Sequence, residues 1–209
     1  QRGISMLVVP MDTPGGTLRP IELLDGGFEV NEVFFEDVRV PSENLIGEVN
    51  KGWDQAKFLL GNERVGIARV GGTKGMLALA KELARETTYN GRPLLEDARY
   101  SSRIAEIENE LVALELTALR VVANSADGKP HPASSVLKLR GSELQQAATE
   151  LLVDIAGPLS LASFAGEDSD VPDWAQTTAL NYLNYRKVSI YGGSNEVQRT
   201  IIAGSILGL

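Results

Sequence analysis

Six apolar residues recur at steps of three and four between positions 104 and 121, and this spacing constrains the fold more than any other feature. They are Ile104, Ile107, Leu111, Leu114, Ala118 and Val121. Because an α-helix turns once in 3.6 residues, the spacing gathers all six on one face. It predicts a helix over residues 94–126, with one buried stripe that other helices must cover.

Further helical stretches are predicted on both sides of this helix. The first of them contains no proline, and another stops at Gly157-Pro158, where a helix is expected to end. The predicted ranges are 53–88, 133–156, 173–189 and 195–207, with a loop over 157–172. Such helices pack their stripes into a common core, so we expect an up-down bundle of about four long helices and a short one over residues 49–209.

Residues 1–48 show a different pattern, in which short β-prone runs alternate with Gly and Pro. The runs are Ile4–Val9, Thr17–Leu24, Phe28–Phe35 and Val38–Val40. The turn residues between them favour short antiparallel strands. We therefore interpret residues 1–48 as part of an antiparallel β-domain. Because Gln1 comes almost directly before the first run, we expect a fragment that is cut within a β-structure.

Composition excludes several classes of function. The net charge of −8 disfavours nucleic acid and anionic membranes as partners, because both repel an acidic surface. The sequence has no cysteine, which excludes disulfides and thiolate chemistry. The single histidine, His131, lies in a Pro-flanked turn and cannot supply the usual set of metal ligands. No apolar run approaches the roughly 20 residues that span a bilayer.

Two adjacent charges, Glu63 and Arg64, interrupt a stretch that is otherwise apolar or small. One interpretation is a solvated pair on the surface of a helix. The other is a functional pair, because a helix that is apolar on most sides is largely buried. A charge on such a helix is costly unless it faces a cleft or a partner.

A Gly-Gly turn, Gly192-Gly193, precedes the last predicted helix. Glycine lets the backbone approach a ligand closely, and Ser194 or Asn195 would cap the helix. Free N–H groups at a helix start attract anions and carbonyl oxygens. An ordinary turn and a ligand site are both consistent with this pattern.

Together and in this order, these stretches resemble the acyl-CoA dehydrogenase family. The residues Phe35–Pro41 and Asn44–Gly47 look like the end of that family's β-domain, and Tyr191–Arg199 looks like its Tyr-Glu-Gly-Thr-x-x-x-x-Arg signature. The resemblance runs over the whole chain. It is closest to bacterial branches that include pimeloyl-CoA and steroid side-chain dehydrogenases, so we expect a cytoplasmic protein.

The resemblance implies a mainly α chain, in which a C-terminal helical bundle follows part of the β-domain (residues 1–48), while an N-terminal helical domain is absent. It also implies FAD as cofactor and an acyl-CoA thioester as substrate, which is oxidised to the trans-2-enoyl-CoA. Assembly as a homo- or hetero-oligomeric dimer or tetramer is expected. Reoxidation by an electron-transfer flavoprotein is implied as well.

One departure from the family pattern is informative. In the commonest pattern the catalytic base is a Glu directly after the Tyr of the signature, and this sequence has Gly192 there. In a minority branch, typified by isovaleryl-CoA dehydrogenase, the base lies on the first bundle helix, just before an Arg. Glu63 with Arg64 matches that position. The resemblance therefore implies that Glu63 removes the α proton, while the Gly192 N–H still binds the thioester oxygen.

The resemblance suggests further site residues. A family motif, Arg-x-x-Phe-Gly, is longer here and runs from Arg85 to Gly91, so Arg85 is one candidate contact to FAD. The substrate-binding candidates are Arg64, Tyr191 and Gly193, and the cofactor-binding candidates are Ser194, Asn195, Glu196, Arg85 and Gly157. Two alternatives remain: a non-catalytic subunit of a heteromeric dehydrogenase, and a helical oligomerisation module without activity.

Overall fold

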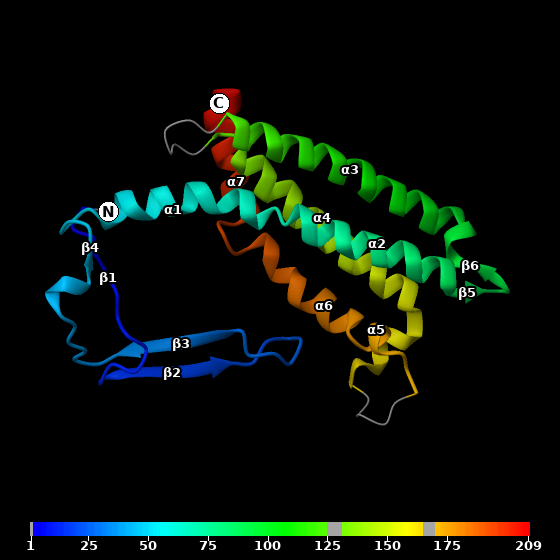
Figure 1. The fold of residues 1–209 in the computed structure, drawn as a ribbon, viewed down its shortest axis with the longest axis horizontal. Helices are drawn as coiled ribbons and strands as arrows, with labels where there is room; N and C mark the ends of the chain where they lie inside the picture. The colour runs from blue at the N-terminus through cyan, green and yellow to red at the C-terminus, as the bar shows by residue number, and fades with distance from the viewer. Residues whose placement is uncertain (1, 125–130, 165–169) are drawn as a thin grey trace. The chain divides into compact units, whose positions relative to one another are not determined.

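The computed structural model describes residues 2–124, 131–164 and 170–209, with the backbone alone described for residues 61–65 and 163–164. These residues form two compact units, Gln1–Gly61 and Asn62–Leu209. The division falls inside helix α1 (Gly52–Ile67). Helices dominate the described chain (Figure 1), which confirms the predicted mainly α fold.

The first unit holds two antiparallel strand pairs. Strand β1 (Met6–Leu7) pairs with β4 (Leu45–Ile46), and β2 (Gly16–Ile21) pairs with β3 (Val30–Phe35). The 3₁₀ turn η1 (Ser42–Asn44) leads into β4. All residues of β2 and β3 are exposed.

The predicted strand Val38–Val40 is wrong. Asp37 has a left-handed φ of 49°, which breaks the extended run after β3. Pro41 then ends the segment before it gains a partner, and the strand that does form, β4, lies four residues further on. The strand pairs are therefore shorter than the apolar runs that predicted them.

The second unit is built from helices that follow α1. The first long ones are α2 (Val70–Glu86), α3 (Ala98–Ala123) and α4 (Ser134–Ala156). Shorter elements complete the unit: β5 (Thr88–Tyr89), β6 (Arg92–Pro93), η2 (Leu94–Glu96), η3 (Gly157–Phe164), α5 (Asp173–Gln176), α6 (Thr178–Asn184), η4 (Tyr185–Ser189), α7 (Asn195–Ile202) and the π-helical turn η5 (Ala203–Leu207).

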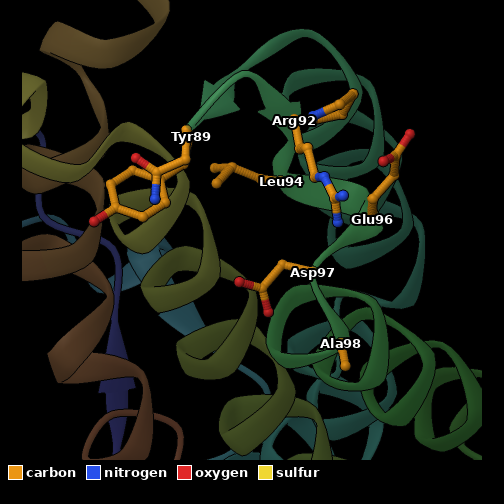
Figure 2. A pocket seen from close by; sticks show the side chains of 8 residues that line it. Tyr89, Arg92, Leu94, Glu96, Asp97 and Ala98 are labelled. Carbon is orange, nitrogen blue, oxygen red and sulfur yellow. The ribbon is translucent and has the colours of Figure 1, made fainter.

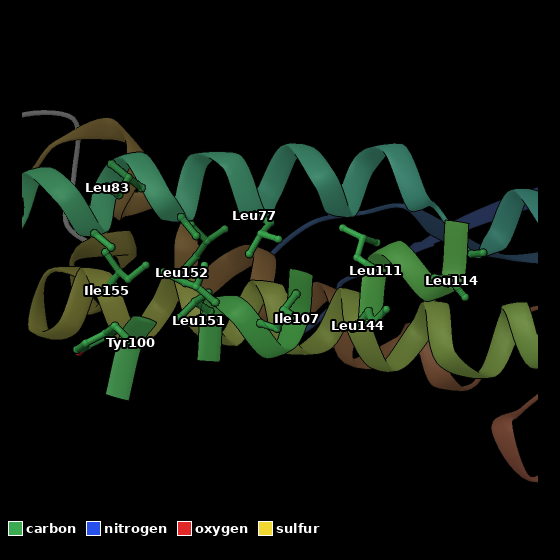
Figure 3. Packing of buried hydrophobic residues seen from close by; sticks show 14 of the residues in the cluster. Leu77, Leu83, Tyr100, Ile107, Leu111, Leu114, Leu144, Leu151, Leu152 and Ile155 are labelled. Carbon is green, nitrogen blue, oxygen red and sulfur yellow. The ribbon is translucent and has the colours of Figure 1, made fainter. Parts of the chain in front are cut away.

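The core of this unit lies where α2, α3 and α4 pack against one another (Figure 3). The predicted stripe on α3 is confirmed: its members are buried, apart from Ala118, which is partly buried against the core. Leucines and isoleucines of α2 and α4 cover it. A fully buried Leu such as Leu151 contributes roughly 1.5–3 kcal/mol relative to an exposed one.

Helix α4 is central, since it contacts α2, α3, α6, α7 and η4. It has two buried faces instead of one. The apolar face includes Leu137, Leu144, Leu151 and Ile155, and the polar face includes Ser134, Lys138, Ser142, Gln145 and Thr149. Polar groups removed from water need hydrogen-bond partners, so the polar face indicates where α4 fastens neighbouring elements.

Several boundaries differ from the sequence-based prediction. The predicted helical stretch over 53–88 divides into α1 and α2, because Arg69 has a left-handed backbone. Helix α3 begins at Ala98 because the Asp97 carboxylate caps it by accepting the Arg99 N–H at 2.8 Å. Residues 88–93 form a β-hairpin that was not predicted, with Asn90 and Gly91 both at positive φ. The predicted loop over 157–172 is wrong at its start, where η3 occupies residues 157–164.

In the part of the chain that the structure describes, no helix combines the length and the apolar character needed to cross a membrane.

Candidate functional site

The Gly-Gly turn lies between η4 and α7. Gly192 and Gly193 have φ of 67° and 84°, a conformation that L-residues with a side chain rarely adopt. Ser194 caps α7, since its Oγ accepts the Val197 N–H at 3.4 Å. The N–H groups of Gly192 and Gly193 donate to no residue within the described part of the chain. Both are therefore free donors on the backbone of this turn.

Gln198 of α7 holds the carbonyl side of the same turn. Its Nε2 donates to Gly193 O at 3.1 Å and lies 3.4 Å from Gly192 O. The side chain is fully buried, and a Cβ on Gly193 would lie 2.6 Å from Nε2 and displace the Gln198 carboxamide. The Gln198 Oε1 is buried and has no hydrogen-bond partner among the described residues.

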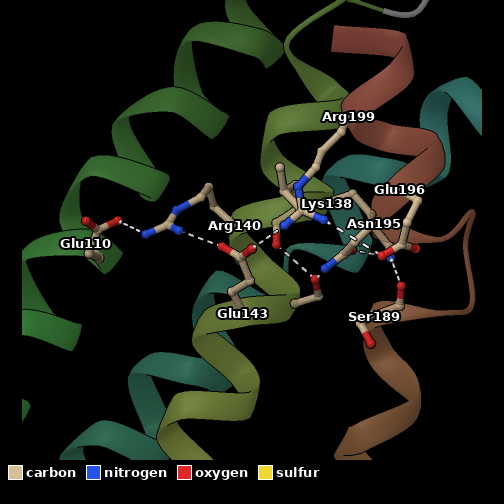
Figure 4. Close-up of polar contacts among 10 residues, drawn as sticks. Glu110, Lys138, Arg140, Glu143, Ser189, Asn195, Glu196 and Arg199 are labelled. Atoms are coloured by element: carbon tan, nitrogen blue, oxygen red, sulfur yellow. Dashed lines mark hydrogen bonds and ion pairs between the residues drawn. The ribbon is translucent and has the colours of Figure 1, made fainter. Parts of the chain in front are cut away.

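Lys138 of α4 lies beside the turn and is fully buried (Figure 4). Its Nζ donates to Asn195 Oδ1 at 2.9 Å and to Ser189 O at 3.2 Å. Ser142 Oγ lies 3.1 Å from the same Asn195 oxygen. Burial lowers the pKa of the Lys138 ammonium, an effect that the Glu196 carboxylate partly opposes.

The last turn of α1 is fastened to the polar face of α4. Gln145 Nε2 donates to Ile67 O at 3.1 Å, which supplies one of the carbonyls at a helix end with a partner. Gly141 allows the close approach: a Cβ there would lie 2.5 Å from Ala68 Cα and 2.8 Å from Ala68 O. Arg69, at φ 45°, interrupts the helical backbone between α1 and α2.

The end of α1 and the Gly-Gly turn meet at Ile67. A Cβ built on Gly192 would overlap Ile67 Cδ1, so these two residues are neighbours in space. Glu63 lies four residues before Ile67 in α1, one helical turn away along the backbone. The side chains of Glu63 and Arg64 lie outside the described residues. Their predicted roles therefore stay predictions.

The cofactor-binding candidates lie at two ends of α4. Ser194, Asn195 and Glu196 are beside Lys138 near its start, whereas Gly157 follows its last residue, about 30 Å further along the axis at 1.5 Å per residue. Gly157 borders a cavity of about 700 Å³, which Tyr89, Tyr100 and Asp154 also line. Arg85 is exposed at the end of α2 and does not line it.

The β5–β6 hairpin adds a second hollow of about 500 Å³ next to the first (Figure 2). Tyr89, Leu94 and Asp97 line both cavities. Both have polar and apolar walls, as ligand sites in proteins commonly do. Among the described residues, no three His, Asp or Glu side chains gather as a metal site would need.

Two further candidates from the sequence, Tyr191 and Glu196, are exposed on either side of the Gly-Gly turn. Tyr191 is 40% exposed at the start of the turn. The exposed Glu196 lies 3.8 Å from Arg199, and its hydrogen bonds with its own backbone N–H and with Ser194 lower its pKa. Arg199, Glu143, Arg140 and Glu110 continue as a chain of ion pairs across α7, α4 and α3 (Figure 4).

Four residues of this site were missed by the sequence analysis. They are Ile67, Lys138, Gln145 and Gln198. One signal was present: Lys138 and Gln145 fall in register with Ser134, Ser142 and Thr149 at helical steps, which marks a second buried face.

The sequence matches the acyl-CoA dehydrogenase C-terminal domain over residues 50–207. The chain therefore belongs to the acyl-CoA dehydrogenase family.

Particular relatives are similar over nearly the whole chain. Acyl-CoA dehydrogenase IpdE1 of Mycobacterium tuberculosis is 34% identical over 210 residues, which cover 99% of this chain and 51% of that protein. The mitochondrial short-chain specific acyl-CoA dehydrogenase of Mus musculus is 31% identical, covering 99% of this chain and 48% of that protein. A chain of the ChsE4–ChsE5 complex of M. tuberculosis superposes with a TM-score of 0.82 at 29% identity, covering 99% of this chain and 52% of that one. The chain thus spans about half the length of the relatives it matches.

Proposed function

We propose that the protein containing this chain carries out FAD-dependent α,β-dehydrogenation of an acyl-CoA thioester to the trans-2-enoyl-CoA, with Glu63 as the base. The observation that carries the proposal is the contact between Gly192 and Ile67. Position 192, the commoner place for the base in this family, holds no carboxylate. Glu63 lies one helical turn before the residue that packs against it.

The Gly-Gly turn supplies the electrostatic part of this chemistry. An α proton next to a thioester is too weakly acidic for a carboxylate unless the enolate oxygen is stabilised as it forms. The Gly192 N–H, which has no described acceptor, is the donor we assign to that oxygen. Gly193 lets the thioester approach the backbone, and Tyr191 and Arg64 border the substrate. Removing one such donor typically costs about 10²–10³ in rate.

The residues present fit FAD. When bound, FAD supplies the acceptor for the hydride that leaves the β carbon. Near the turn, Ser194 and Glu196 present polar groups at the start of α7, and the orphaned Gln198 Oε1 is a buried acceptor without a described partner. Asn195 is engaged with Lys138, so we assign it an indirect role in shaping the turn. Gly157 lies about 30 Å from this turn along α4, too far for the same FAD. We therefore assign Gly157 and Arg85 to the FAD of a neighbouring subunit, as the family resemblance implies.

The proposed partners follow from the family. They are an acyl-CoA, an electron-transfer flavoprotein as electron acceptor, and further subunits in a dimer or tetramer. The similarity to a chain of the ChsE4–ChsE5 complex supports an assembly of more than one subunit.

A second candidate function is that of a non-catalytic subunit in a heteromeric dehydrogenase. It is favoured by the same Gly192, since a chain without a carboxylate there could leave the base to another subunit, and by the similarity to a complex of two different chains. In that case Glu63 contributes to packing alone. An inactive helical oligomerisation module would bind no flavin at all.

The test uses the full-length protein, purified with its bound flavin and mixed anaerobically with a panel of acyl-CoAs. We expect the flavin absorbance to bleach with at least one of them. Glu63→Gln is expected to slow the bleaching by about 10²–10⁴, the usual contribution of a general base. The acyl-CoA dissociation constant should change little, because most binding contacts lie along the CoA and the acyl chain.

Glu82→Gln is the matched control, because Glu82 is an exposed glutamate on α2. It should bleach at the wild-type rate. Wild-type bleaching in Glu63→Gln would assign the base to another residue and favour the non-catalytic subunit. A protein without flavin would favour the oligomerisation module.

A further inference from the structure

A lysine with no exposed surface is unusual in a folded protein, because removing an ammonium from water is costly. Lys138 is such a residue, and its described hydrogen-bond partners, Asn195 Oδ1 and Ser189 O, are both neutral. No carboxylate among the described residues pairs with it directly. The lowered pKa of Lys138 agrees with a charge that folding holds at a cost.

The two partners of Lys138 bracket the Gly-Gly turn. Ser189 is the last residue of η4, and Asn195 is the first residue of α7. One ammonium group therefore ties together the backbone that enters the turn and the helix that leaves it (Figure 4). Other described bonds to α4 act on one side of the turn only: Gln146 binds carbonyls of η4, and Ser142 binds Asn195. Among the described hydrogen bonds, Lys138 alone joins α4 to both flanks of the turn.

Gln198 and Lys138 act on different parts of this turn. Gln198 Nε2 binds the carbonyls of Gly192 and Gly193. Because Gln198 belongs to α7, these bonds would hold the turn to α7 even if α7 moved. Lys138 belongs to α4, the central helix, and it binds both the residue before the turn and the residue after it to that helix. A hydrogen bond to a charged group is stronger than one between neutral groups.

We propose that Lys138 is a positioning residue: its buried ammonium bridges Ser189 and Asn195 and thereby fixes the turn whose Gly192 N–H binds the substrate's carbonyl oxygen. The bridge itself is independent of the proposed function. Its consequence for the reaction rests on that function.

Hydrogen–deuterium exchange in the full-length protein tests the bridge without reference to activity. The amides to follow are those of Ile190 and Tyr191, which donate to Lys187 O, and of Val197, which donates to Ser194 Oγ. Lys138→Met removes the donors but keeps much of the length. It should speed exchange at these amides by about ten- to a hundredfold, which corresponds to the loss of a charge-assisted hydrogen bond.

Lys138→Gln keeps two N–H donors without the charge, and it should recover part of the protection. Lys74→Met is the control, since Lys74 is exposed and pairs with Glu115 on the surface; exchange at the three amides should be unchanged. If Lys138→Met fails to fold, Asn195→Ala removes the same bond from the other side and is expected to speed exchange at the same amides. Wild-type exchange in the variant that folds would overturn the proposal.

An activity measurement then separates this proposal from the proposed function. In a flavin-bound protein that acyl-CoA bleaches, Lys138→Met should slow bleaching at saturating substrate about tenfold or more, with a smaller change in the dissociation constant. Faster exchange in a protein that no acyl-CoA bleaches would support the bridge and contradict the function. Unchanged exchange with normal bleaching would contradict the bridge and leave the function standing.

Discussion

The last turn of α1 and the turn before α7 are both fastened to α4, but by different means. At the end of α1, the backbone of Ala68 lies against Gly141, and a neutral carboxamide, Gln145, binds Ile67 O. At the Gly-Gly turn, the buried ammonium of Lys138 binds Asn195 Oδ1 and Ser189 O. Close packing fixes the first region, and a charged hydrogen bond fixes the second.

The difference has a functional meaning under the proposed mechanism. The region that would carry the base, α1, is held by steric contact, which tolerates little change in distance. The region that would carry the carbonyl donor is held through its oxygen atoms. Lys138 binds Ser189 O and Asn195 Oδ1, and Gln198 binds Gly193 O. These bonds therefore leave the N–H groups of the turn available. Helix α4 sets the separation of the two.

The largest effect is expected from adding a side chain at Gly141, where α4 lies against the residue that follows α1. Gly141→Ala places a Cβ against the backbone of Ala68, and backbone cannot rotate away as a side chain can. We expect a loss of about 1–3 kcal/mol in the free energy of unfolding, as overpacking usually costs. Gly75→Ala is the matched control, because nothing lies within 4 Å of its new Cβ, and it should stabilise α2 by about 0.5–1 kcal/mol. Urea unfolding measures both, and equal stabilisation by the two would contradict the close contact.

A smaller effect is expected when the carboxylate is moved between the two regions. In the Glu63→Gln background, Gly192→Glu should restore little flavin reduction, because the positive φ strains a residue with a side chain and its Cβ would push against Ile67 Cδ1. Adding Ile67→Ala removes the overlap and should recover about tenfold of the roughly 10²–10⁴ that was lost. Ile67→Ala with Glu63 intact shows the effect of the truncation alone. Recovery without Ile67→Ala would mean that the overlap does not limit position 192.

The smallest effect is expected from replacing Gln145 or Gln198, each of which donates a hydrogen bond to a backbone carbonyl in one of the two regions. Gln145→Met leaves Ile67 O without its donor, and Gln198→Met does the same for Gly193 O. Each should cost about 1 kcal/mol of unfolding free energy, since a buried carbonyl loses its partner. The loss is moderated because each glutamine also has a buried oxygen without a described partner. Hydrogen exchange should quicken at Arg69 N for Gln145→Met and at Tyr191 N for Gln198→Met, and crossed effects would contradict the separation.

The packed helices were predictable because their signal is periodic. The stripe from Ile104 to Val121 on α3 is confirmed, since a spacing of three and four has one structural meaning. The β5–β6 hairpin was missed although Asn90-Gly91 is the commonest two-residue hairpin turn. Its strands are two residues long, too short to give an alternating pattern.

The residues that fasten the site were harder to predict. A lysine is normally predicted to be exposed to solvent. The burial of Lys138 could be predicted only from its helical spacing to Ser134, Ser142 and Gln145, which mark a second buried face of α4. The contact between Ile67 and Gly192 joins positions 125 residues apart, and no local pattern encodes it. Glu63 was found through the empty position at Gly192, and its role stays a prediction.

The central claim, that Glu63 removes the α proton, is tested most directly by proton exchange. With the flavin of the full-length protein chemically reduced, no acceptor remains for the hydride, and an acyl-CoA in D₂O reports proton removal alone. We expect the wild-type protein and Glu82→Gln to incorporate deuterium at the α carbon, as followed by mass spectrometry. Glu63→Gln should exchange about 10²–10⁴ times more slowly. Exchange at the wild-type rate in Glu63→Gln would contradict the account.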